Sequence, residues 1–168
     1  STNSDIYVMN LTSGAIKNIT IRNRGYDAGP IYTRDGKQII YRSQATAGFE
    51  ADRWRLMAYD RATGVSVELA KGFDLQVDDV ALSPDERTLY AASRDEVWAL
   101  DVGTPGVLVD AHLIAVLEDG GFGVASLAVD GAGDVVAAAG ARVWTLAPSG
   151  AVLDEFRVPT TVRDVAPV

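Results

Sequence analysis

A repeat of about 45 residues is the feature that most constrains the fold of this chain. A short aromatic strand followed by a glycine turn occurs four times along the sequence. The copies are "DIYVMNLTSG" (5–14), "RWRLMAYDRATG" (53–64), "EVWALDVGTPG" (96–106) and "RVWTLAPSG" (142–150). Their closing glycines lie 50, 42 and 44 residues apart. Such a period predicts a series of similar units, each built from the same few strands.

Two further patterns complete each repeat. A pair of apolar strands joined by a tight turn precedes the aromatic strand, as in "VDDVALSPDERTLYAAS" (77–93). An alternating strand of the kind that faces solvent follows the glycine turn, as in "VSVELA" (65–70). Each repeat therefore predicts four strands, and this number in about 45 residues is typical of a β-propeller blade.

We expect an all-β chain of about four four-stranded blades in a single domain or half-propeller, 1–168. The predicted units are a partial blade at 1–25, blades at 26–72, 73–119 and 120–158, and a partial blade at 159–168. The N-terminus begins at a third strand, and "TTVRDVAPV" (160–168) predicts a first strand. The ring then closes on itself with four blades, or with a second copy into a ring of about eight blades. Four blades is the low end of the known range, which favours homodimerisation.

Composition excludes several partners and chemistries. The net charge of −8 argues against a nucleic acid or an anionic membrane as partner, because both recruit clustered Lys and Arg. There are no cysteines, so disulfides and thiolate chemistry are excluded. No apolar run has the length of a membrane span and no signal peptide is evident, so we expect a soluble chain of unknown compartment.

Residues 5–95 resemble the propeller of the prolyl oligopeptidase family and its TolB-type repeats. The stretches that carry the resemblance are "DAGPIYTRDGKQIIYRSQ" (27–44) and "GFEADRWRLMAYDRATG" (48–64). In the dipeptidyl and acylaminoacyl peptidases of that family, this hairpin lies near the catalytic domain. The resemblance thus offers Glu50 and Asp52 as contacts for a substrate amine, with Arg53 and Arg55 as counter-charges. The alternative, which we favour, is an exposed hairpin whose polar residues only face solvent.

Residues 107–168 resemble the gluconolactonase and senescence-marker-protein family of six-bladed propellers. The resemblance rests on "VASLAVDGAGDVVAAAGARVWTL" (124–146). The family places a metal-binding Asn or Asp at the position that Ala125 occupies here, and alanine has no donor oxygen for a cation. The joining of two resemblances in one chain indicates a chimera, a fragment-derived propeller or an engineered one.

Catalytic residues are not evident. The peptidase chemistry of the first family requires a separate domain with a G-x-S-x-G elbow, and this motif is absent from the sequence. The single histidine, His112, lies in an apolar strand and is expected to be structural. We therefore expect no enzyme activity and no cofactor.

A channel metal site is the remaining alternative for chemistry. Asp27, Asp79 and Asp164 occupy the same place in three repeats, at the start of a predicted inner strand. They either cap the local turn through backbone N–H groups, which we favour, or form a ring of carboxylates that binds a divalent cation. The predicted function is a non-enzymatic propeller scaffold or interaction module that assembles with itself. The alternative is a ligand- or metal-binding propeller, either degenerate gluconolactonase-like or gating substrate for a peptidase.

Overall fold

The computed structural model describes residues 3–166, except for 73–75, 103–107, 119–120 and 122. Contacts between Cα atoms divide the chain into two compact units, Ser1–Lys71 and Gly72–Val168. All regular elements in the described residues are β-strands. The predicted glycine turn at Gly106 lies outside the described residues.

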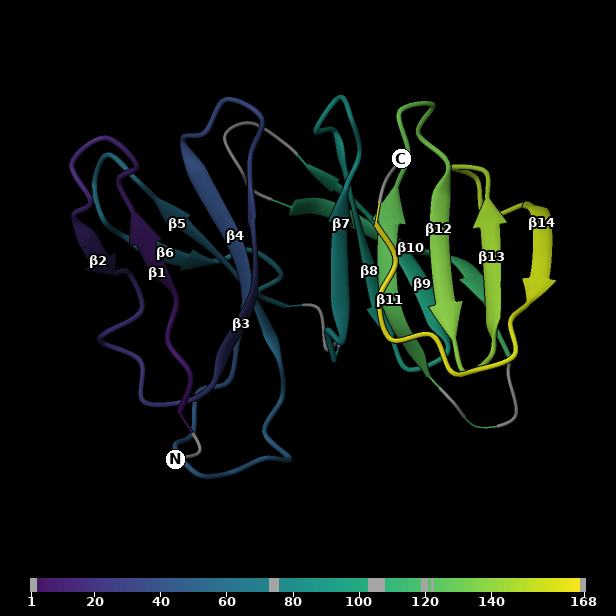
Figure 1. Ribbon diagram of the computed structural model, residues 1–168, viewed down its shortest axis with the longest axis horizontal. Helices are drawn as coiled ribbons and strands as arrows, with labels where there is room; N and C mark the ends of the chain where they lie inside the picture. The colour runs from purple at the N-terminus through teal and green to yellow at the C-terminus, as the bar shows by residue number, and fades with distance from the viewer. Residues whose placement is uncertain (1–2, 73–75, 103–107, 119–120, 122, 167–168) are drawn as a thin grey trace. The chain divides into compact units, whose positions relative to one another are not determined.

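Unit 1 contains a two-stranded sheet and a four-stranded sheet (Figure 1). The first sheet comprises β1 (Tyr7–Met9) and β2 (Ile16–Asn18). The second comprises β3 (Asp27–Tyr32), β4 (Gln38–Ser43), β5 (Arg55–Asp60) and β6 (Ser66–Glu68), paired antiparallel in chain order. The core lies between the two sheets, where Ile6, Ile39, Tyr41 and Tyr59 are buried together.

Unit 2 contains two further four-stranded antiparallel sheets. One comprises β7 (Asp79–Leu82), β8 (Thr88–Ser93), β9 (Glu96–Val102) and β10 (Leu108–Val116). The other comprises β11 (Val124–Val129), β12 (Val135–Ala139), β13 (Arg142–Leu146) and β14 (Val152–Arg157). A single buried cluster joins these two sheets, from Ala81 and Val97 on one side to Leu127 and Trp144 on the other. The small alanines of β12 allow this close packing because they fill little space between the sheets.

The turns between β3 and β4 and between β7 and β8 share one hydrogen-bond pattern. In "TRDGK" the Thr33 hydroxyl donates to Asp35 at 2.9 Å, and the Lys37 amide donates to the same carboxylate oxygen at 2.9 Å. In "SPDER" Ser83 and Arg87 make the equivalent bonds to Asp85. These bonds lower the pKa of Asp35 to about 2. The sequence repeat therefore corresponds to a repeat in local hydrogen bonding.

One predicted element differs in the structure. Residues 160–166, expected to form a first strand, have no strand pairing (Figure 1, yellow trace beside β11). The Val162 amide donates to the Gly140 carbonyl in a turn, and the Val165 amide donates to the Ser126 side chain. Because these donors reach a turn and a hydroxyl instead of a neighbouring strand, no ladder forms.

Candidate functional site

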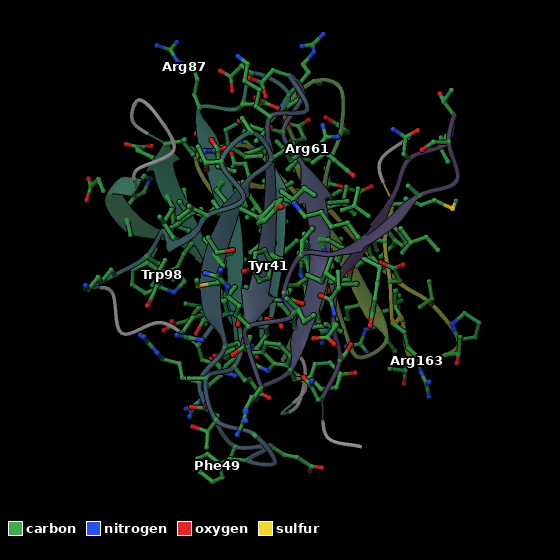
Figure 2. The ribbon with its side chains drawn as sticks, turned by 90° about the vertical axis from the view of Figure 1, so that its left-hand side faces the viewer. Tyr41, Phe49, Arg61, Arg87, Trp98 and Arg163 are labelled. Carbon is green, nitrogen blue, oxygen red and sulfur yellow. The ribbon has the colours of Figure 1, made fainter. Side chains whose placement is uncertain are left out.

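The loop that follows β4 is closed by its own polar residues. Asp52 accepts hydrogen bonds from the backbone amides of Ala45 at 2.8 Å and Thr46 at 2.6 Å. Burial raises the pKa of Asp52, but these backbone donors outweigh it and lower the pKa below its ordinary value. The Gln44 side chain donates to the Glu50 and Asp52 carbonyls. Asp52 therefore holds the loop in shape, while Phe49 lies at its outer end, far from Tyr41 in the sheet (Figure 2).

The other residues of the predicted loop contact have separate surroundings. Glu50 is exposed, and its carbonyl accepts the Gln44 bond. Arg53 forms an ion pair with Glu68 of β6 at 3.1 Å. Arg55 donates to the Ser43 carbonyl and hydroxyl, both at 3.4 Å. A contact of Glu50 or Asp52 with a substrate amine stays a prediction.

Asp27 is the most buried of the three predicted metal-binding carboxylates, at 1% exposure. Its Oδ1 accepts a hydrogen bond from the Asn23 side-chain Nδ2 at 3.0 Å, and its Oδ2 has no partner within the described residues. Burial raises the pKa of the Asp27 carboxyl, and the neighbouring hydrogen-bond donors lower it by less. Burial thus makes the ionised form of Asp27 less favourable than that of an exposed carboxylate.

Asp79 and Asp164 both bond to β11 in unit 2. Asp79 Oδ2 accepts from the Leu127 amide at 2.8 Å, so it binds a backbone N–H of the neighbouring sheet instead of capping its own turn. Asp164 Oδ1 accepts from the Ser126 hydroxyl at 3.0 Å. The hydroxyl oxygen of Ser126 in turn accepts from the Val165 amide at 3.2 Å.

Ser126 is the residue that sequence reasoning missed. Ser126 occupies the position on β11 that Asp79 occupies on β7. Asp79 accepts a hydrogen bond from the Leu127 amide in the next repeat, and Ser126 accepts one from the Val165 amide in the repeat after that. The signal in the sequence is the alignment of "VASLAVD" (124–130) with "VDDVALS" (77–83), which places the Ser126 hydroxyl where Asp79 has its carboxylate. In unit 2 this position ties successive inner segments together.

The described part of the chain contains no cluster of side chains that could form a metal site. No three His, Asp or Glu side chains there lie close enough to hold an ion. The stretch "DGAGD" (130–134) is a turn in which Asp130 accepts from the backbone amides of Ala132 and Asp134. A metal site at Asp27, Asp79 and Asp164 stays a prediction.

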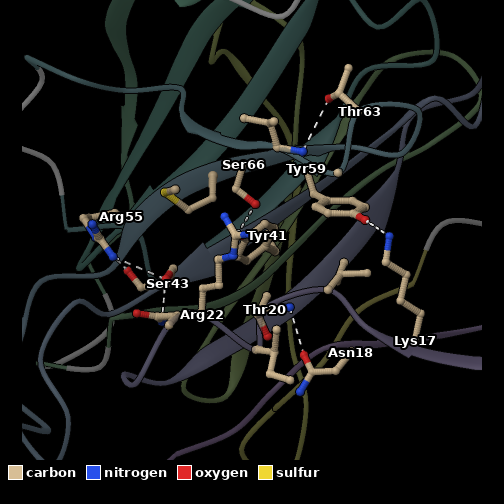
Figure 3. Close-up of a pocket in the computed structure, with 16 residues that line it drawn as sticks. Lys17, Asn18, Thr20, Arg22, Tyr41, Ser43, Arg55, Tyr59, Thr63 and Ser66 are labelled. Atoms are coloured by element: carbon tan, nitrogen blue, oxygen red, sulfur yellow. Dashed lines mark hydrogen bonds between the residues drawn. The ribbon is translucent and has the colours of Figure 1, made fainter.

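Unit 1 contains a pocket of about 640 Å³ (Figure 3). One wall is β2 and the segment that follows it, residues 17–23; the other is the face of β4, β5 and the turn before β6. Polar groups on its floor hydrogen-bond to one another. The Tyr41 hydroxyl donates to the Ser66 hydroxyl at 3.0 Å, and Lys17 donates to the Tyr59 hydroxyl at 2.7 Å. Burial raises the pKa of Tyr41, which keeps the phenol protonated and able to donate.

These features define a class of protein, a chain of four-stranded antiparallel β-propeller blades. Comparison with known proteins agrees. No protein-family model matches the chain. Dipeptidyl-peptidase 5 of Porphyromonas gingivalis is 43% identical over 108 residues, which cover 62% of this chain and 16% of that protein. Dipeptidyl-peptidase 5 of Trichophyton equinum is 29% identical over 122 residues, or 72% of this chain and 17% of that protein. The chain is thus partly homologous to the propeller region of this prolyl oligopeptidase-family enzyme.

Solved structures confirm the fold. A gluconolactonase from Xanthomonas campestris matches with a TM-score of 0.67 and 22% identity, over 83% of this chain and 48% of that one. Regucalcin from Agrobacterium tumefaciens, described as a calcium-binding protein, matches with a TM-score of 0.71 and 12% identity, over 95% of this chain and 56% of that one. The chain therefore spans about half the length of these propellers and about a sixth of the curated peptidases. Among the described residues there is no long apolar helix that could cross a membrane.

Proposed function

We propose that the chain is a non-enzymatic propeller module that assembles with a second copy of itself through the two-stranded sheet of unit 1. The observation that carries this proposal is the incomplete pairing of β1. In the described residues β1 pairs only with β2, whereas the other sheets have four strands each. The aromatic strand pattern makes β1 the third strand of a blade, and no described residue pairs with it on the side where a second strand belongs.

Backbone geometry supports the use of this edge. Hydrogen bonds join the Asn10 amide to the Ala15 carbonyl, and the Ile19 amide to the Ile6 carbonyl. Because bonded pairs alternate along an antiparallel ladder, Tyr7 and Met9 direct their backbone N–H and C=O groups to the open edge. An unpaired edge of this kind is a template for another strand.

Side chains around the edge support it too. Tyr7 and Met9 on β1 are 60% and 54% exposed, and Ile16 and Ile21 nearby are also exposed. The segment 160–166 of a second copy is the proposed occupant of this edge, in place of the second strand that the described residues lack, because it lies beside β11 without a ladder of its own. The resulting ring of about eight blades belongs to the same proposal.

The solution mass tests this assembly. Size-exclusion chromatography with light scattering over a range of concentrations is expected to give twice the chain mass of 17.8 kDa. Met9→Pro is expected to give a single-chain mass, because proline removes the N–H that faces the open edge and edge strands tolerate it. Leu11→Ala, in the exposed turn after β1, is the control and should stay dimeric. A single-chain mass at every concentration, or a dimer that survives Met9→Pro, contradicts the proposal.

The alternative function, a ligand-binding propeller, is favoured by one observation. This is the pocket of unit 1, whose lining combines cations, hydroxyls and apolar side chains.

A further inference from the structure

The charge of the pocket lining contrasts with that of the whole chain. Three cationic side chains line the pocket, Lys17, Arg22 and Arg55, and the lining contains no Asp or Glu. The chain as a whole carries a net charge of −8. Low-dielectric walls focus the electrostatic field of charges that line a cleft. A pocket lined by cations therefore attracts anions even on a protein whose net charge is negative.

The three cations keep hydrogen-bonding capacity toward the pocket. Among the described residues, none of them forms an ion pair with a carboxylate. Lys17 bonds the Tyr59 hydroxyl, and Arg55 bonds Ser43 weakly at 3.4 Å. Figure 3 shows Arg22 extending into the pocket toward Tyr41, and within the described part of the chain its guanidinium has no hydrogen-bond partner. A guanidinium in this state matches the geometry of a carboxylate or a phosphate.

Two carboxylates lie close to the pocket without lining it. Asp27 accepts a hydrogen bond from the side chain of Asn23, which lines the pocket. Asp5 accepts one from the hydroxyl of Thr20, another lining residue, at 3.4 Å. Asp27 is buried behind Asn23, which also donates to Ser43 and to the Gln44 carbonyl. The two carboxylates therefore hydrogen-bond to wall residues of the pocket and form no ion pair with its three cations in the described part of the chain.

The rest of the lining limits the size and character of the ligand. The volume of about 640 Å³ falls within the range of small-molecule sites. Ile19, Ile21, Met57 and Val65 supply apolar surface beside the hydroxyls of Thr63 and Ser66. Such a lining suits a molecule with one apolar part and one charged end.

We infer that this pocket binds a small organic oxyanion, a carboxylate or phosphate ester joined to an apolar group, with Arg22 as its principal contact. The inference rests on the ligand-binding alternative and is independent of dimer formation. Its failure would leave the mass measurement above unaffected.

Titration with three matched probes tests the inference. Phenyl phosphate and benzoate share an oxyanion on an aromatic ring, and benzyl alcohol keeps the ring without the charge. At constant ionic strength, calorimetry and methyl NMR of Met57 and Val65 are expected to show saturable binding of at least one anion. Benzyl alcohol is expected to bind at least tenfold more weakly. The anion that binds more tightly identifies the charged end.

Two arginine variants locate the site. Arg22→Gln is expected to weaken binding of the anion at least tenfold, since it removes the guanidinium group without breaking a hydrogen bond among the described residues. Arg24→Gln, two residues along the same exposed segment and outside the lining, should bind as the parent does. Arg55→Gln provides a second variant, and circular dichroism checks that each variant folds. Binding of neither anion, equal binding of benzyl alcohol, or equal losses in Arg22→Gln and Arg24→Gln would overturn the inference.

Discussion

At the scale of single residues, one position connects neighbouring repeats in unit 2. Asp79 and Ser126 each offer a side-chain oxygen to a backbone amide of the next inner segment, at 2.8 and 3.2 Å. The Leu127 amide is thereby satisfied, although its residue is buried. A buried amide that loses its acceptor costs about 1–3 kcal/mol.

The variant Asp79→Ala is therefore expected to lower the free energy of unfolding of unit 2 by about 1–3 kcal/mol. Asp79→Asn should lower the free energy of unfolding by less, because the side-chain oxygen of asparagine can still accept a hydrogen bond from the Leu127 amide. Urea unfolding followed by circular dichroism measures the difference. Glu118→Ala, at an exposed position of the same unit, is the matched control and should change little. Equal losses in Asp79→Ala and Glu118→Ala would show that the bond to Leu127 contributes nothing to stability.

At the scale of elements, the two-residue turns between second and third strands have the same geometry but different residues. Ser93 pairs with Glu96 around one turn, and Ala139 pairs with Arg142 around the other. The first turn residue is Arg94 with a φ of 57° in one sheet, and Gly140 with a φ of 56° in the other. This left-handed conformation costs a non-glycine residue about 1–2 kcal/mol.

Exchange of these residues is expected to have opposite effects on stability. Arg94→Gly should stabilise unit 2 by about 0.5–1 kcal/mol, since it relieves the strain but adds flexibility to the unfolded chain. Gly140→Ala should destabilise it by about 1–2 kcal/mol. Chemical denaturation of the two variants beside the parent checks both signs. Destabilisation by Arg94→Gly would mean that its exposed side chain contributes more than the strain costs.

The elements also show how far the sequence could predict the structure. The repeat predicted the four-stranded sheets because strand alternation and turn residues are local properties of the chain. Residues 160–166 form no strand within this chain, because strand formation there depends on a neighbouring strand, and their pairing with N-terminal strands stays a prediction. Ser126 was missed because its role depends on the amide of Val165, which is far away in sequence. The pocket was not predicted either, since Arg22 and Arg55 meet there only through the packing of two sheets.

At the scale of the whole molecule, the solved propellers raise the question of a bound cation. The likeness to a calcium-binding regucalcin, at 12% identity, concerns the fold alone. The sequence resemblance implies a ligand position at Ala125, whose side chain has no donor oxygen. Asp79 and Asp164 accept hydrogen bonds from Leu127 and Ser126, so a cation would have to compete with these donors.

Calcium or zinc at millimolar concentration is therefore expected to leave the melting temperature unchanged, and so is a chelator. A ligand that binds only the folded state stabilises it by RT ln(1 + c/Kd) at free ligand concentration c, so a specific site would raise the melting temperature steadily as the cation concentration exceeds Kd. Sodium chloride at matched ionic strength separates this effect from general screening of the net charge of −8. A concentration-dependent rise with calcium or zinc that is absent with sodium chloride, and lost in Asp164→Asn, would instead support the channel carboxylates as a metal site.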